Sequence, residues 1–129
     1  MSAMDITEAF NPARGDRLYD LAEVMRSKNA GPLYLTFDLI FPDSRVYRRV
    51  LDSGALTARL VGELYDVPEK FVSIVSFDAA NAIKITIPRT GPTSGAPGDR
   101  DVYGAQQHEP LIGIRIPKPV ESVGTTAQR

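Results

Sequence analysis

The most constraining feature of this sequence is the stretch Leu33–Phe41, in which every second residue is a large apolar side chain. Successive side chains of a β-strand point to opposite faces of a sheet, so this alternation predicts a strand. One face of the strand belongs to a hydrophobic core and the other is mixed. The apolar face comprises Leu33, Leu35, Phe37, Leu39 and Phe41, and the mixed face comprises Tyr34, Thr36, Asp38 and Ile40.

Two helices are predicted directly after this strand. Asp43 can accept a bond from the free amides of a first turn, and Gly54 stands where a helix usually ends. Thr57 is the corresponding cap of a second helix, which Asp66, Val67 and Pro68 stop. The buried stripes, at helical spacing, are Val46, Tyr47, Val50 and Leu51 in the first helix and Leu60, Val61, Leu64 and Tyr65 in the second.

Further alternation predicts two strands at Phe71–Phe77 and Ala82–Ile87, joined by a turn at Asp78–Asn81. Ile112, Ile114 and Ile116 indicate a final strand after a long loop, Arg89–Arg100. The segment Leu18–Met25 fits either a helix or a strand, and Arg26–Pro32 reads as a loop. Strands in hairpin-like runs with adjacent helices favour an α+β fold, in which a helix pair covers one face of an antiparallel or mixed sheet.

Length and composition limit the possible classes of protein. The 129 residues suffice for one domain, which we expect at 17–117, between a loose arm at 1–16 and a frayed tail at 118–129. The net charge of −1 provides no field that would attract nucleic acid or an anionic membrane. We see no apolar run that could span a bilayer, and a cytoplasmic location fits these features. With no cysteine and one histidine, zinc-thiolate and histidine-rich metal centres within one chain are excluded.

The run Arg26, Ser27, Lys28, Asn29 brings two cations, a hydroxyl and an amide close to Gly31. If this segment is a turn, its side chains and backbone amides can bind an anion such as phosphate or a carboxylate. The alternative is a solvated loop whose charges have no ligand. The glycine-rich stretch Gly91–Gly98 fits neither a dinucleotide-binding nor a phosphate-loop spacing.

The segment Asp101–His108 contains the single histidine and a high density of polar side chains. His108 titrates near neutral pH in its unperturbed state, so His108 and Tyr103 are candidate proton carriers. Gln106 and Gln107 suit the fixing of a ligand better than its transformation. The alternative is a surface histidine that forms only local hydrogen bonds. Asp78 and Asn81 are further ligand candidates, although turn chemistry explains both of them.

Three motifs together resemble one family. They are Leu18–Ala22 followed by Arg26–Gly31, then Phe77–Lys84, then Gly98–His108. The family is a bacterial group of small proteins described only as a domain of unknown function (family 4387), and its members look like companions of acyclic terpene utilisation (AtuA-type) proteins. The first motif is also similar to the start of the small C-terminal domain of AtuA-type proteins, where Arg-Ser-Gly-Asp-Lys-Gly is typical and this chain has Arg-Ser-Lys-Asn-Ala-Gly.

The resemblance implies a ferredoxin-like α+β sandwich and a strand at Leu18–Ala22. It also implies a small subunit that works beside a larger AtuA-type subunit in acyl-CoA or organic-acid breakdown, with hydration or dehydration as the expected lyase step. A coenzyme A thioester is then the expected substrate, and no cofactor is evident. The alternative is a non-catalytic scaffold or regulatory module that associates with its partner or with itself. Whether the chain is itself an enzyme stays open at this point.

Overall fold

Four strands form the antiparallel sheet that the alternating sequence predicts. The computed structural model describes residues 6–89 and 109–119. In the main sheet, neighbouring strands follow the order β2-β3-β5-β4. These strands span Val24–Asn29 (β2), Tyr34–Ile40 (β3), Ala82–Pro88 (β5) and Ser73–Phe77 (β4).

The two predicted helices lie between β3 and β4 in the chain, with the predicted caps. Helix α3 spans Ser44–Ser53, and the Asp43 carboxylate accepts a hydrogen bond from the Val46 amide at 2.9 Å. Helix α4 spans Ala58–Tyr65, and the Thr57 hydroxyl accepts one from the Leu60 amide at 3.0 Å. Gly54 ends α3 in the left-handed region, as expected for a C-terminal glycine.

The core lies between the sheet and the helices. On the predicted apolar face, Leu35, Phe37, Leu39 and Phe41 are buried, but Leu33, which precedes β3, is 56% exposed. The buried residues pair in register with the buried isoleucines of β5: Leu35 opposite Ile87, Phe37 opposite Ile85, and Leu39 opposite Ile83. Tyr47 and Val50 from α3 and Val61 from α4 complete this layer and are almost fully buried. The Phe41 and Tyr47 rings lie 6.4 Å apart, which joins the end of β3 to α3.

Segments that precede and follow this sandwich in the chain form a second, two-stranded sheet. β1 (Gly15–Arg17) pairs antiparallel with β6 (Arg115–Pro117). Around this ribbon lie α1 (Ile6–Ala9), the 3₁₀ turn η1 (Pro12–Arg14), α2 (Leu18–Leu21) and α5 (Glu109–Ile112), and two further 3₁₀ turns, η2 (Glu69–Phe71) and η3 (Asp78–Ala80), flank β4. Ala9 is fully buried, so part of the expected loose arm contributes to the core.

Three local predictions were wrong. Leu18–Leu21 is a helical turn, not the strand that the resemblance implies, because Leu18 is buried there and its amide donates to the Ile114 carbonyl at 2.7 Å. The expected loop Arg26–Pro32 is mostly strand, because β2 continues to Asn29 by pairing with β3. Ile112 belongs to α5, because a helical turn brings both Leu111 and Ile114 into the core.

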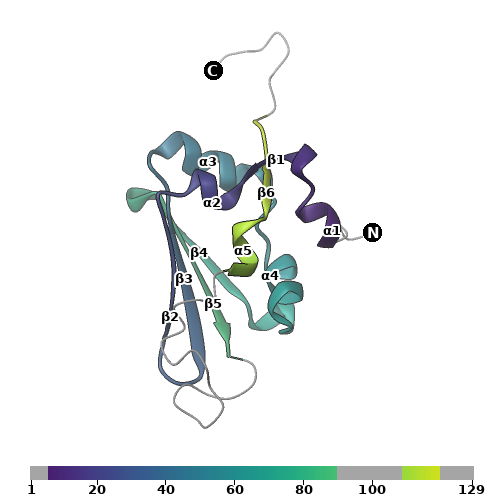
Figure 1. The fold of residues 1–129 in the computed structure, drawn as a ribbon. Helices are drawn as coiled ribbons and strands as arrows, with labels where there is room; N and C mark the ends of the chain where they lie inside the picture. The colour runs from purple at the N-terminus through teal and green to yellow at the C-terminus, as the bar shows by residue number, and fades with distance from the viewer. Residues whose placement is uncertain (1–5, 90–108, 120–129) are drawn as a thin grey trace.

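The predicted α+β sandwich is confirmed. Figure 1 shows the four-stranded sheet as one layer, with α3, α4, α5 and the β1–β6 ribbon together on one side of it. The link β3–α3–α4–β4 is a split β-α-β unit, because β5 lies between β3 and β4. In the described ranges no helix has the length and apolar character that a membrane span requires. The opposite face of the sheet is lined by the even-numbered side chains of β3 and β5.

Candidate anion-binding surface on the open face of the sheet

The strand register arranges the outer face of the sheet in three rows across the strands. One row is apolar, with Val24, Ile40, Ala82 and Phe77 side by side. The next row is charged, with Arg26, Asp38 and Lys84 followed by Val75. The third row is polar, with Lys28, Thr36, Thr86 and Ser73. Here "open face" means these twelve residues.

Cations outnumber carboxylates on the open face. Asp38 lies between Arg26 and Lys84 and forms an ion pair with Arg26, with the Nε and Oδ2 atoms 3.5 Å apart. The Arg26 side chain is 61% exposed and that of Asp38 is 16% exposed. With Lys28, three cations and one carboxylate leave a formal excess of two positive charges.

The spacing of these cations suits a small anion. The Cα atoms of Arg26 and Lys84 lie two strands apart, or about 10 Å, and those of Arg26 and Lys28 about 7 Å apart. Arginine and lysine side chains are long enough to converge on one phosphate or carboxylate group across such spacings. The face can therefore offer charge-assisted hydrogen bonds to an anionic ligand.

The structure separates the residues that the sequence placed in one anion-binding turn. Arg26 and Lys28 point to the open face, but the alternation of β2 turns Ser27 and Asn29 to the opposite face. Ser27 is buried, and the Asn29 side-chain oxygen accepts a hydrogen bond from Arg89. An anion bound by Arg26 and Lys28 on the open face would not contact Ser27 or Asn29.

Lys84 is the cation that the sequence reading did not select. Lys84 is exposed in the structure. The alternation of Ile83, Ile85 and Ile87 already placed Lys84 on the outer face. Its position next to Asp38 depends on the register of β3 with β5, which no local pattern specifies.

The candidate ligand residues Asp78 and Asn81 form the turn between β4 and β5. Asn81 adopts the left-handed conformation that ends η3, and its carbonyl accepts from the Phe41 amide at 2.9 Å. Asp78 accepts a hydrogen bond of 2.5 Å from the Tyr47 hydroxyl. Burial raises the pKa of Tyr47, and the bond to Asp78 raises it further. These contacts give both residues a structural role in the turn.

The remaining candidates, Tyr103, Gln106, Gln107 and His108, lie outside the described residues. Their roles stay predictions from the sequence. Among the side chains that the structure does describe, no group of three or more His, Cys, Asp or Glu residues is placed to hold a metal ion.

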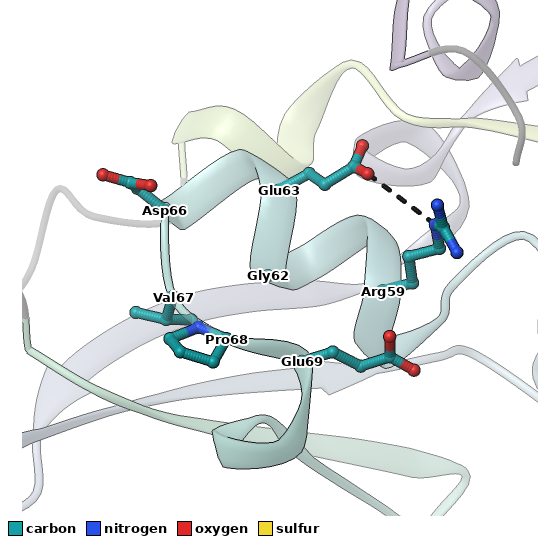
Figure 2. Close-up of a pocket in the computed structure, with 7 residues that line it drawn as sticks. All are labelled: Arg59, Gly62, Glu63, Asp66, Val67, Pro68 and Glu69. Carbon is teal, nitrogen blue, oxygen red and sulfur yellow. Dashed lines mark ion pairs between the residues drawn. The ribbon is translucent and has the colours of Figure 1, made fainter.

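A separate hollow of about 510 Å³ lies beside α4 and η2. Its lining is acidic, since Glu63, Asp66 and Glu69 face only Arg59, whose Nε atom lies 3.7 Å from Glu63. Figure 2 shows Asp66 at one end of α4, away from Glu63 and Glu69, so the carboxylates do not converge. The charge of this hollow is opposite to that required for an anion, which leaves the open face as the better candidate.

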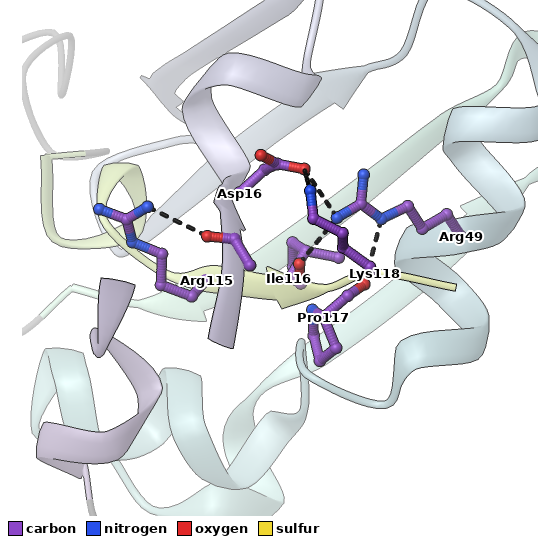
Figure 3. A network of polar contacts seen from close by, with 7 residues as sticks. Asp16, Arg49, Arg115, Ile116, Pro117 and Lys118 are labelled. Atoms are coloured by element: carbon purple, nitrogen blue, oxygen red, sulfur yellow. Dashed lines mark hydrogen bonds and ion pairs between the residues drawn. The ribbon is translucent and has the colours of Figure 1, made fainter. Parts of the chain in front are cut away.

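A polar clamp fastens the β1–β6 ribbon to α3. Arg49 donates to the carbonyls of Pro117 at 3.1 Å and Ile116 at 2.9 Å, and to the Asp16 carboxylate at 2.9 Å (Figure 3). The Arg49 hydrogen bond holds the pKa of Asp16 below its usual value, with a further contribution from Lys118, 3.8 Å away. Because Arg49 is only 14% exposed and bonds to backbone, we assign this cluster to stability.

These features define a small α+β sandwich with one cationic sheet face that none of the described helices covers. The chain matches the model of a family described as "Domain of unknown function (DUF4387)" over residues 18–115, and it belongs to that family. Neither the curated proteins nor the solved structures gave a match. The matched range includes all four strands of the main sheet and hence the whole open face.

Proposed function

We propose that this chain is the small subunit of a two-component enzyme of acyl-CoA or organic-acid catabolism, and that it works with a larger AtuA-type subunit. The supporting observation is the open face, where three cations stand next to an apolar row. In this proposal the apolar row packs against the larger subunit, and Arg26, Lys28 and Lys84 hold the carboxylate or phosphate of the substrate.

The charge distribution supports an interface of this kind. The apolar row and the cations share one face, so a partner covering the former would partly enclose the latter. Exclusion of water strengthens each ion pair, since the effective dielectric constant falls. The exposed cations are expected to bind anions weakly in the isolated chain and more strongly in the assembled pair.

Calorimetry of the isolated chain and of the reconstituted pair with phosphate, a carboxylate and coenzyme A tests the anion site. The double substitution Arg26→Gln, Lys28→Gln should weaken binding about 3- to 30-fold, which corresponds to about 0.7–2 kcal/mol. The matched control Arg45→Gln, Lys70→Gln removes the same charge from exposed positions outside the open face. Equal affinities in the two double variants would refute the role of Arg26 and Lys28.

Partnership with the larger subunit is tested by co-expression and co-purification with an AtuA-type protein. Phe77→Ser removes a 46% exposed apolar side chain from the apolar row and should reduce recovery of the pair. Tyr19→Ser alters a similarly exposed side chain in α2, off the sheet, and should leave recovery unchanged. An equal loss in both variants, or in neither, would count against docking through the apolar row.

The role that the sequence suggests for His108 distinguishes two hypotheses: a catalytic two-component enzyme, and a non-catalytic scaffold or regulatory module. If His108 carries a proton, His108→Gln in the reconstituted pair should lower turnover about 10²–10⁴-fold while assembly persists. In the scaffold alternative, turnover of each assembled complex should change little. Turnover and assembly measured on the same preparation distinguish these two outcomes.

A further inference from the structure

The two edges of the main sheet differ in how they are protected. A free strand edge presents unpaired N–H and C=O groups, and natural proteins usually protect it with charged residues, proline or bulges. The β2 edge carries Arg26 and Lys28. The β4 edge, Ser-Ile-Val-Ser-Phe, has no charge and no proline, and its residues Ser73, Val75, Ser76 and Phe77 are exposed.

Hydrogen-bond alternation shows which backbone groups of β4 face outward. The Arg89 amide donates to the Leu33 carbonyl and the Phe41 amide to the Asn81 carbonyl, so odd-numbered residues form the bonded pairs between β3 and β5. The even-numbered residues of β5 therefore bond to β4, where they face Ser73, Val75 and Phe77. It follows that the backbone groups of Ile74 and Ser76 point away from the sheet.

We propose that β4 pairs antiparallel with β4 of a second copy of this chain, which joins the two main sheets into one continuous sheet. If all five residues pair, Val75 lies opposite Val75 of the second copy on the two-fold axis. The outward-facing backbone groups of Ile74 then form hydrogen bonds with those of Ser76 in the second copy. By symmetry, Ser76 pairs in the same way with Ile74 of the second copy. On the outer face, Val75, which is 44% exposed, meets Val75 of the second copy, and Phe77, which is 46% exposed, lies opposite Ser73 and diagonal to Val75 of the second copy.

Charge complementarity favours a second copy in this antiparallel orientation. The strand itself is uncharged, so no like charges meet along it. Exposed charges of both signs flank it, with Glu69 and Lys70 before the strand and Asp78, which pairs with Arg48 at 3.9 Å, after it. Antiparallel pairing brings the Lys70 end of one chain to the Asp78 end of the other. The pairing uses the strand edge and leaves Arg26, Lys28 and Lys84 clear of the second copy, so it can be tested apart from the anion site. Two open-face residues, Val75 and Phe77, border the new strand pair.

A single cysteine tests both the partner and the register. The chain has no cysteine, so Val75→Cys can form a disulfide only between copies. Directly opposite residues in a non-hydrogen-bonded antiparallel pair have Cα atoms about 4.5 Å apart, within the range for a disulfide. Mild oxidation should convert Val75→Cys largely into a covalent dimer. Phe77→Cys is the control, because its counterpart lies about four residues away, or about 13 Å, and it should remain mostly uncrosslinked.

Light scattering on the full-length chain measures the association without a crosslink. An interface this small should give a reversible dimer with a micromolar dissociation constant. In Val75→Glu the new carboxylate lies beside Lys84 in its own sheet, so the fold and the circular dichroism spectrum should not change. Across the two-fold axis it lies opposite the same carboxylate of the second copy, and this repulsion should weaken the dimer at least tenfold. A strict monomer up to submillimolar concentration, or equal crosslinking of both cysteine variants, would overturn the proposal. Binding of β4 only to another protein's strand would also overturn it.

Discussion

Replacing Arg49 by methionine should destabilise the fold far more than the same change at its neighbour Arg48. Methionine keeps most of the apolar stem but removes three hydrogen bonds, to the carbonyls of Ile116 and Pro117 and to Asp16. The Ile116 residue is fully buried, so its carbonyl would lose a partner that water does not readily replace. Arg48 is 55% exposed, and among the described residues its ion pairs are the two of 3.9 Å with Asp52 and Asp78.

The magnitude follows from these contacts. Two bonds from a charged donor to backbone carbonyls are worth about 1.5 kcal/mol each here, the low end for hydrogen bonds to charged groups. The pair with the 43% exposed Asp16 adds at most about 1 kcal/mol because of solvent screening. The expected loss for Arg49→Met is therefore about 3 kcal/mol, or a fall in Tm of about 10 °C for a domain of this size.

Urea denaturation and thermal scans of wild type, Arg49→Met and Arg48→Met provide the assay. The Arg48→Met variant should lie within about 0.5 kcal/mol of wild type. Hydrogen exchange should show the largest loss of protection at β1 and β6, the two strands that the clamp holds. Equal stability of the two variants would refute the inference that the Arg49 contacts stabilise the fold.

Three further predictions use the same measurements. Gly15→Ala should cost several kcal/mol of stability and disrupt β1–β6 pairing, because its Cβ atom would lie 2.0 Å from the Ile116 carbonyl oxygen. In the control Gly54→Ala the Cβ atom meets no atom within 4 Å, so the cost should be only about 1 kcal/mol, for the left-handed backbone. Asp43→Ala should lower the free energy of unfolding by about 1 kcal/mol through loss of the α3 cap, and Asp52→Ala, on the exposed side of α3, should have little effect. The pKa of Asp16 in the folded state lies below its usual 3.8, so its contribution to stability is present above about that pH and is lost as the pH falls through the lower folded value. The free energy of unfolding of Asp16→Asn should therefore fall less steeply with acidification than that of wild type.

The sequence by itself determined those parts of the fold whose causes are local. The alternation in Leu33–Phe41 specified β3 and its buried face, because the side-chain period of a strand is fixed by backbone geometry. Asp43, Gly54 and Thr57 specified helix ends, because a cap acts within one turn of its own position. The two-layer α+β arrangement followed from the order of these elements.

The tertiary structure alone decided what depends on contacts between distant segments. Leu18–Leu21 is too short for its own propensity to select helix or strand; the burial of Leu18 and its backbone hydrogen bond to Ile114 select the helix. The pairing of Gly15–Arg17 with Arg115–Pro117 joins segments about a hundred residues apart, and neither has an apolar alternation long enough to predict a partner.

The candidate surface has the same mixed origin. The sequence selected Arg26 and Lys28 as cations, but it grouped them with Ser27 and Asn29 because a turn was expected. Strand alternation in β2 separates the two pairs, and the register of three strands places Asp38 and Lys84 beside Arg26. Register depends on the burial of the whole opposite face of the sheet, so the charge pattern of the open face follows from packing on its other side.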